Sequence, residues 1–313
     1  MPDQSKKVSA FAPATIANAV AGFDVLGLAL SEPGDIVTVW ASESAGISIA
    51  PLAAPFDTLP HNADQNTAGV AVRSLLDSQG LDTGLFLEIQ KGVPIVGGMG
   101  SSASSGVAAV VAVNELLGLG LGANELLPHV LRSEEMATGA PHADNAAPSL
   151  FGGFTIIRSL DPIDIVPLKP ALPLSCVLVH PHMQIKTRDA RNILPQELAR
   201  RTATDQMGHV SGFIAGLLTG DAALVSRSMR DEIAEPHRGK LIPGYDRVKE
   251  VSLAAGALGC GISGSGPSMF ALCPDQATAR IVGKSMGAVF ADHDLGYDLF
   301  ISDIAEQGAR ILD

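Results

Sequence analysis

Glycines and hydroxyl side chains gather in one short segment, where residues 97–105 read GGMGSSASS. A strand-like stretch precedes this segment and a helix-like stretch of small residues follows it. The first N–H groups of a helix have no partners inside the helix, and the helix dipole is positive there. Glycines let the backbone approach a ligand closely, and Ser101 and Ser102 add hydroxyl donors. The pattern predicts a cradle for a phosphate group.

Three other interpretations compete for this segment. An ordinary Walker A loop is excluded because the GK[ST] ending is missing. Gly98, Gly100 and Ala103 fit the loose dinucleotide fingerprint G-x-G-x-x-A, but that fingerprint usually follows the first strand of its domain, and no acidic residue stands roughly 20 positions later at the end of a second strand. A plain tight turn before a packed helix is the structural alternative. The loop alone favours phosphate binding and leaves the last two interpretations open.

Composition and charge narrow the class of protein. The chain has 313 residues, of which 46% are hydrophobic and 17% are charged, so it can build a sizeable core and has room for two domains. Its net charge of −12 argues against a nucleic-acid partner, which usually meets a basic face. ATP is still compatible, since a few local N–H groups and cations can hold phosphates on an acidic protein.

Cysteine usage and hydropathy indicate a cytoplasmic protein without a membrane partner. The three cysteines, Cys176, Cys260 and Cys273, are odd in number and far apart, so we expect buried thiols and neither a zinc site nor a disulfide framework. The start of the chain shows no targeting segment. The apolar region 106–122 contains an Asn and a Glu, which favours a buried helix over a membrane span.

Strand-like and helix-like segments alternate along the chain and predict an α/β or α+β fold. Two prolines near residue 170 mark a link, and we place the domain boundary there, giving domains 1–169 and 170–313. Strands are expected at residues 8–11, 35–40, 85–90, 154–157, 163–166, 177–179, 258–263, 269–272 and 297–301. Helices are expected at residues 66–78, 101–117, 123–136, 196–218, 221–229, 246–255 and 276–291.

Three segments together resemble the motifs of the GHMP kinases, a family that phosphorylates small alcohols such as galactose and mevalonate. Residues 94–103 resemble the P-x-x-x-G-L-G-S-S-A loop, with Met99 where Leu is usual. Residues 12–27 resemble the N-terminal motif, and residues 261–268 resemble the C-terminal one. All three occur in the family's order. One departure is residues 18–22, NAVAG, where the family more often has Asn-x-Gly-x-Gly, so the geometry of that turn is in question.

This resemblance implies an α+β fold of two domains with ATP between them: an N-terminal α/β nucleotide domain, residues 1–169, and a ferredoxin-like C-terminal domain, residues 170–313. It implies Mg²⁺ as cofactor, held by Ser102 and Glu134; Glu134 is preferred over Glu135 because of its spacing to Asn145. The residues expected to contact the nucleotide are Pro94, Ile95, Val96, Gly97, Gly98, Met99, Gly100, Ser101, Ser102, Ala103, Ser104 and Asn66.

Segments 142–153, 187–195 and 235–244 resemble those members of the family that phosphorylate homoserine. The implied reaction converts ATP and L-homoserine into ADP and O-phospho-L-homoserine, on the route to threonine. By the same resemblance, an aspartate meets the substrate ammonium and two arginines meet its carboxylate, because an Arg fork binds a carboxylate bidentately. The residues expected at the substrate are Asp24, Arg191, Arg238, Asn145, Asn18, Thr187 and Gly264.

Several points stay open at the level of sequence. Asp144 could be a general base or the N-cap of a short helix over residues 146–150, but we expect phosphoryl transfer here to proceed by positioning and charge neutralisation. His142 is expected to be structural. Another small-alcohol kinase, such as a mevalonate-type enzyme, and a catalytically silent sensor are the alternatives; the intact loop and Glu134 favour an active enzyme. A homodimer is compatible with the sequence.

Overall fold

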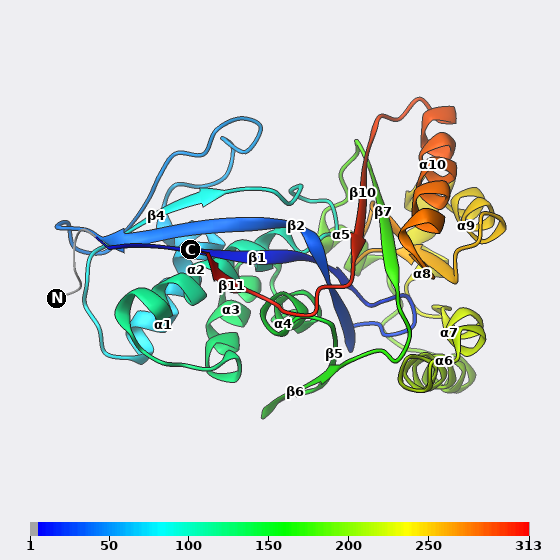
Figure 1. Cartoon of the computed structure of the whole chain (residues 1–313), viewed down its shortest axis with the longest axis horizontal. Coiled ribbons are helices and arrows are strands. Elements are labelled where there is room, and N and C mark those ends of the chain that lie inside the picture. Colours follow the sequence, from blue (N-terminus) through cyan, green and yellow to red (C-terminus); the bar gives the residue numbers. More distant parts are fainter. Residues whose placement is uncertain (1–5, 313) are drawn as a thin grey trace.

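The computed structural model describes residues 6–312, apart from the side chain of Thr187, and it contains two β-sheets with their helices side by side along the long axis (Figure 1). The N-terminal sheet has the strand order β11-β1-β2-β4-β3, and β5 pairs with both β2 and β6. Its strands are β1 (Lys7–Ala17), β2 (Leu26–Ala41), β3 (Ile47–Ile49), β4 (Leu85–Gln90), β5 (Phe154–Leu160), β6 (Ile163–Leu168) and β11 (Arg310–Leu312).

Helices cover one face of the N-terminal sheet because its side chains alternate. Val37 and Val39 of β2 and Leu85 and Leu87 of β4 point into the core formed with the helices, while residues between them face outward. These helices are α1 (Thr67–Ser78), α2 (Ser101–Leu117), α3 (Ala123–Thr138) and α4 (Ala143–Phe151). The predicted Asn66 cap of α1 is confirmed, since its side chain accepts a hydrogen bond from the N–H of Ala68 at 3.0 Å.

The C-terminal sheet is antiparallel and has the strand order β10-β7-β9-β8. This order, with helices between β7 and β8 and between β9 and β10, is the ferredoxin-like topology that was expected. The strands are β7 (Ser175–Pro181), β8 (Gly259–Ile262), β9 (Met269–Cys273) and β10 (Tyr297–Asp303). The helices are α5 (Thr187–Asn192), α6 (Arg200–Thr219), α7 (Ala222–Ser228), α8 (Glu235–Arg238), α9 (Tyr245–Ala254) and α10 (Gln276–Asp292), and the 3₁₀ turns are Ala63–Gln65 and Gly239–Leu241.

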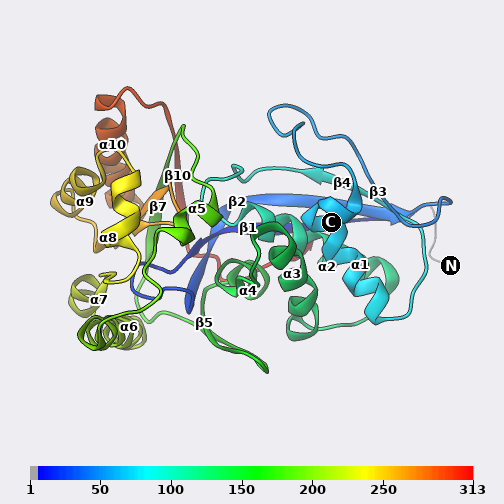
Figure 2. The ribbon, with the colours of Figure 1, turned by 180° about the vertical axis from the view of Figure 1, so that it is seen from behind.

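A hydrophobic cluster spans the two halves, in addition to a separate cluster within each half. Ile16 of β1 and Leu28 of β2 belong to the same buried cluster as Phe213 of α6 and Phe270 of β9. Seen from behind, α5 lies between the N-terminal helices and α8 (Figure 2). A shared core fixes the relative position of the two halves, so residues from both can build one site.

Comparison with the expected elements brings one correction and several omissions. The chain returns at its end to the first sheet, where β11 pairs with β1 and Ser9 lies opposite Leu312. A C-terminal domain running to residue 313 is therefore incomplete as a description, because the sequence of this short strand carries no sign of its distant partner. Strand β3 and the short helices α5 and α8 were also missed. The three cysteines are free and buried, as expected. Within residues 6–312, no helix combines the length and apolarity needed to cross a bilayer.

Candidate functional site

A cavity of about 740 Å³ opens where the three sequence motifs meet. It is lined by residues of both halves, among them Asn18, Gly98, Glu134 and Gly264. Thr15 donates its backbone N–H to the Met99 carbonyl at 3.1 Å, which joins the first motif to the glycine-rich loop. The three motifs, residues 12–27, 94–103 and 261–268, are far apart in sequence, and the fold brings them together at this cavity.

The glycine-rich loop could not take this form with other residues at two positions. Gly98 and Gly100 have φ angles of 74° and 68°, in the left-handed region that favours glycine. A Cβ on Gly98 would lie 2.3 Å from the Ser263 carbonyl oxygen, and one on Gly100 would lie 2.1 Å from the Thr15 hydroxyl. Ser263 also donates its hydroxyl to the Gly98 carbonyl at 2.6 Å. The loop is thus seated against the third motif before any ligand arrives.

Several side chains predicted to contact the nucleotide are used elsewhere. Met99, Ala103 and Ser104 are at most 1% exposed, so their side chains cannot reach a ligand in the cavity. Ser104 donates its hydroxyl to the Pro13 carbonyl at 2.9 Å and its N–H to the Gly100 carbonyl, which makes it a structural residue. Ser101 donates its hydroxyl to the Val93 carbonyl at 3.0 Å. Ser101 and Ser104 therefore stabilise the loop, because their position in the first turn of α2 directs their hydroxyls towards backbone carbonyls.

The remaining predicted nucleotide contacts lie at the cavity. Its lining includes Ile95, Val96, Gly97, Gly98, Gly100, Ser101, Ser102 and Asn66, whereas Pro94 is not part of it. The Asn66 side chain is engaged at both ends: its oxygen caps α1, and its NH₂ group donates to the Pro60 carbonyl at 2.9 Å. Any contact with a nucleotide would therefore use the second N–H of this NH₂ group or the second lone pair of the oxygen.

The predicted magnesium ligands Ser102 and Glu134 both line the cavity, and the Ser102 hydroxyl is near enough to the Glu134 carboxylate to affect its pKa. Glu134 is buried at 3% exposure, and its Oε1 atom has no partner. Burial raises the pKa of Glu134 to about 7, while the Ser102 hydroxyl and the Lys91 charge oppose that rise. A buried carboxylate oxygen left without a donor suits a cation, and Mg²⁺ commonly takes one or two protein oxygens together with substrate phosphates. The pair therefore fits a magnesium ion.

Asp144 and Asn145 lie on the first turn of α4, beside the loop. The helix begins at Ala143, so the prediction that Asp144 caps a helix over residues 146–150 is wrong: Asp144 is the second residue of the helix, within its first turn. Burial raises the pKa of Asp144 to about 7, and the nearby Asp24 charge adds to the rise. Asn145 accepts a hydrogen bond from the Thr15 hydroxyl at 2.8 Å, which fixes its amide against the first motif.

Asp24 and Arg191 form a two-pronged ion pair, with Nη1 and Nη2 of the guanidinium at 3.1 and 2.9 Å from the two carboxylate oxygens. Both side chains are partly exposed to the cavity, at 39% and 38%. His142 lies 3.2 Å from Arg191 through Nδ1, and its buried Nε2 has no partner. Burial lowers the pKa of His142, and the Arg191 charge lowers it further, so the imidazole is neutral here.

Arg238, which was expected to bind the substrate carboxylate, is almost completely buried. It is 3% exposed, and it donates to the Ala190 carbonyl at 3.0 Å and to the Gly264 carbonyl at 2.9 Å. The Gly264 carbonyl also accepts the Asn18 amide at 3.2 Å. Arg238 thus supports α5 and the third motif as well as lining the cavity, and burial lowers its pKa.

The turn after β1 has a left-handed backbone although Val20 stands where the family more often has glycine. Asn18 and Val20 have φ angles of 69° and 65°, and Val20 is 1% exposed. A β-branched residue there is strained by ~1–2 kcal/mol, and burial in the shared core helps to hold it. The side-chain amide oxygen of Asn18 also accepts a hydrogen bond from the N–H of Asp24 at 2.9 Å, which holds the two ends of the turn together.

Sequence reasoning missed four residues of this region. Lys91, Lys186 and Arg188 line the cavity, and Thr15 holds Asn145. Lys91 could have been predicted, because it is a single lysine directly between the alternating strand at residues 85–90 and the glycine-rich loop. The prediction for the Thr187 hydroxyl falls on a side chain outside the described part of the structure; its backbone opens α5.

The fold and the loop geometry define a class of phosphoryl-transfer enzyme, and comparison with known proteins agrees. Residues 66–153 match the GHMP kinases N terminal domain, and residues 213–292 match the GHMP kinases C terminal domain. The chain belongs to the GHMP kinase family, and the dinucleotide-fold interpretation of the loop is thereby excluded.

The relatives place the chain more narrowly within the family. It is 43% identical to the homoserine kinase of Chlorobium phaeobacteroides strain BS1 over 98% of this chain and all of that protein. It is 37% identical to the homoserine kinase of Xanthomonas campestris pv. campestris strain B100, over 98% of this chain and 94% of that one. The crystal structure of homoserine kinase from Cytophaga hutchinsonii superposes with a TM-score of 0.95 at 43% identity, covering 100% and 99% of the two chains. Its place in the family is among the homoserine kinases.

Proposed function

We propose that the protein transfers the γ-phosphoryl group of ATP to the side-chain hydroxyl of L-homoserine, giving ADP and O-phospho-L-homoserine. The observation that carries the proposal is the full-length similarity to homoserine kinases. The cavity agrees with it, because Asp24 and Arg191 offer one negative and one positive charge beside the phosphate loop, as an amino-acid substrate requires. This assignment makes the chain a kinase that supplies a precursor of threonine.

At the amino-acid end, the Asp24 carboxylate would bind the substrate ammonium, and the Arg191 guanidinium would bind the substrate carboxylate. Without substrate, Asp24 and Arg191 are paired with each other. Bound homoserine would replace this ion pair by two, one between its ammonium and Asp24 and one between its carboxylate and Arg191. Arg238, with two donors fixed on carbonyls, adds positive charge behind this position. Asn145 and Asn18 line the same cavity, and they would orient the hydroxyl that reacts.

At the phosphate end, the N-terminus of α2 and the left-handed glycines supply N–H donors and a positive dipole. Ser102 and Glu134 would hold Mg²⁺, which supplies neutralisation of the charge that develops on the phosphates during transfer. The protein's own contribution is positioning: it holds the loop, the two ligand oxygens and the acceptor hydroxyl around one cavity.

Substrate choice is the direct test of the proposed function. With ATP and Mg²⁺, L-homoserine should support ADP release well ahead of mevalonate or galactose, because only an amino acid satisfies both Asp24 and Arg191. A coupled ADP-release assay over this panel measures it, with D-homoserine as a matched control for the geometry of the zwitterion. Faster ADP release with mevalonate would refute the substrate and leave the family assignment intact.

Asp144 tests whether a general base takes part. We expect Asp144→Asn to lower kcat by less than ~10², whereas removal of a general base typically costs ~10²–10⁴. A base with a pKa of about 7 must lose its proton to act, so kcat/KM would fall as pH drops below about 7, and the variant would lose that dependence. A larger loss together with a vanished acidic limb, in a variant folded by circular dichroism, would establish Asp144 as the base.

A further inference from the structure

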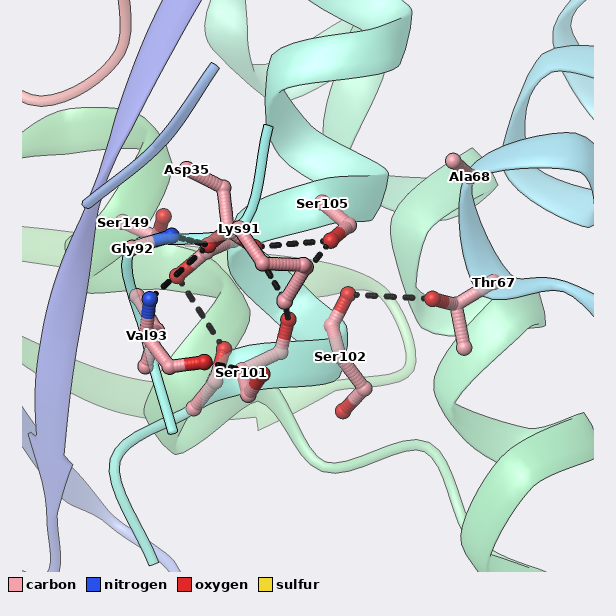
Figure 3. A network of polar contacts seen from close by, with 12 residues as sticks. Asp35, Thr67, Ala68, Lys91, Gly92, Val93, Ser101, Ser102, Ser105 and Ser149 are labelled. Atoms are coloured by element: carbon pink, nitrogen blue, oxygen red, sulfur yellow. Dashed lines mark hydrogen bonds and ion pairs between the residues drawn. The ribbon is translucent and has the colours of Figure 1, made fainter. Parts of the chain in front are cut away.

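Behind the phosphate loop lies a buried ion pair that the roles above do not use. Asp35, on β2, and Lys91, immediately after β4, form a hydrogen-bonded pair whose side chains are 0% and 2% exposed (Figure 3). Taking two charges out of water is unfavourable, and well-packed apolar residues are often as stable or more stable in such a place. Stability alone is therefore a poor explanation for this pair.

Every hydrogen-bonding position of the pair is occupied by the protein. The Asp35 oxygens receive two donors each: the N–H groups of Gly92 and Val93 at 3.0 and 3.1 Å on one, and Lys91 and the Ser105 hydroxyl on the other. The three donors of the Lys91 ammonium go to Asp35, to the Ser101 carbonyl at 2.8 Å and to the Ser105 hydroxyl at 2.9 Å. Lys91 therefore has no donor left for a ligand, although it lines the cavity.

These bonds tie together the two ends of the phosphate loop. Lys91 is the residue at which the loop leaves β4, and Ser101 is the residue at which α2 begins; the Lys91–Ser101 bond closes the loop at its base. The Ser101 hydroxyl adds a second closure onto the Val93 carbonyl at 3.0 Å. The pair is neutral overall, but Lys91 lines the cavity and Asp35 does not, so the positively charged end of the pair is the one that faces the phosphate site.

We propose that Asp35 and Lys91 are positioning residues for phosphoryl transfer: the pair clamps the base of the phosphate loop in its ligand-ready form and places a positive charge beneath the bound phosphates, without contacting them. The proposal rests on the proposed function for its relevance to turnover. Nucleotide binding tests the clamp separately, because ADP affinity does not depend on which alcohol is phosphorylated.

The test is the double variant Asp35→Asn/Lys91→Met, which removes both buried charges and keeps side chains of similar size. We expect it to fold with a melting temperature near that of the original chain, to bind ADP in EDTA about tenfold more weakly, and to have a kcat lower by about tenfold or more. The KM for homoserine should change by less than about twofold. ADP binding by calorimetry in EDTA needs no metal and no turnover.

The single variant and a control separate this role from a structural one. Lys91→Met alone leaves Asp35 buried and unpaired, so it should lower the melting temperature markedly. The control is the exposed Asp64–Arg73 pair, where the variant Asp64→Asn/Arg73→Met should keep both the melting temperature and the ADP affinity of the original chain. If the neutral double variant regains stability and also binds ADP normally, the pair is only structural and the proposal is wrong. If the double variant does not fold, Ser105→Ala removes one bond of each charge; ADP affinity unchanged in that variant would equally overturn the proposal.

Discussion

Glu134→Gln is expected to lower kcat by ~10²–10³, the loss typical of one removed charge-stabilising group, while the fold is retained. The side chain keeps its size but can no longer offer a carboxylate to a cation. Glu134 is buried with an unpartnered oxygen, so the change acts on the cavity and not on the surface. Steady-state kinetics at increasing Mg²⁺ should show a raised requirement for the metal.

A control variant and a stability measurement test this prediction. Glu135→Gln alters the neighbouring residue, which is exposed and paired with Arg132 at 3.2 Å, and it should leave kcat within about twofold. The pKa of Glu134 is raised to about 7 by burial, so its ionisation opposes folding as pH rises through that value. Glu134→Gln should therefore be at least as stable as the original chain at pH 8. Equal losses in the two variants, or full activity in Glu134→Gln, would remove Glu134 from the site.

Arg191→Lys is expected to raise the KM for homoserine by ~10-fold or more and to leave the KM for ATP nearly unchanged. The substitution keeps the charge but loses the fork that now grips both oxygens of Asp24, and ~1.5 kcal/mol of two-pronged bonding corresponds to about tenfold in binding. The substrate carboxylate does not react, so its contact contributes alike to the ground state and the transition state. Its loss appears in KM more than in kcat.

A matched control is available for this prediction in the exposed Arg201–Asp205 pair of α6, where Arg201→Lys should leave both constants unchanged. Equal rises in the KM values for ATP and homoserine would mean that Arg191 supports the nucleotide or α5. No change in either would make the Asp24–Arg191 pair an ordinary ion pair. Arg238 is a less clean probe, because its buried donors hold two backbone carbonyls and a lysine there would also disturb the fold.

The sequence by itself determined the phosphate loop, the family and most of the elements around the site. A positive φ at Gly98 and Gly100, the cap at Asn66 and the alternation along β4 are local properties, set by residue type and by neighbours a few positions away. Motif order and spacing carried the kinase assignment, because phosphate binding at a helix N-terminus needs only a short stretch of chain.

Only the tertiary structure decided which polar groups are free to meet a ligand. Ser101 and Ser104 look equivalent to Ser102 in sequence, yet packing turns their hydroxyls onto backbone carbonyls. Ser102 instead lines the cavity together with Glu134. Asp35 and Lys91 lie 56 residues apart, and their pairing follows from the register of β2 and β4. The return of β11 to β1 is equally non-local. Such contacts depend on how separate elements pack, and no local pattern of residues specifies them.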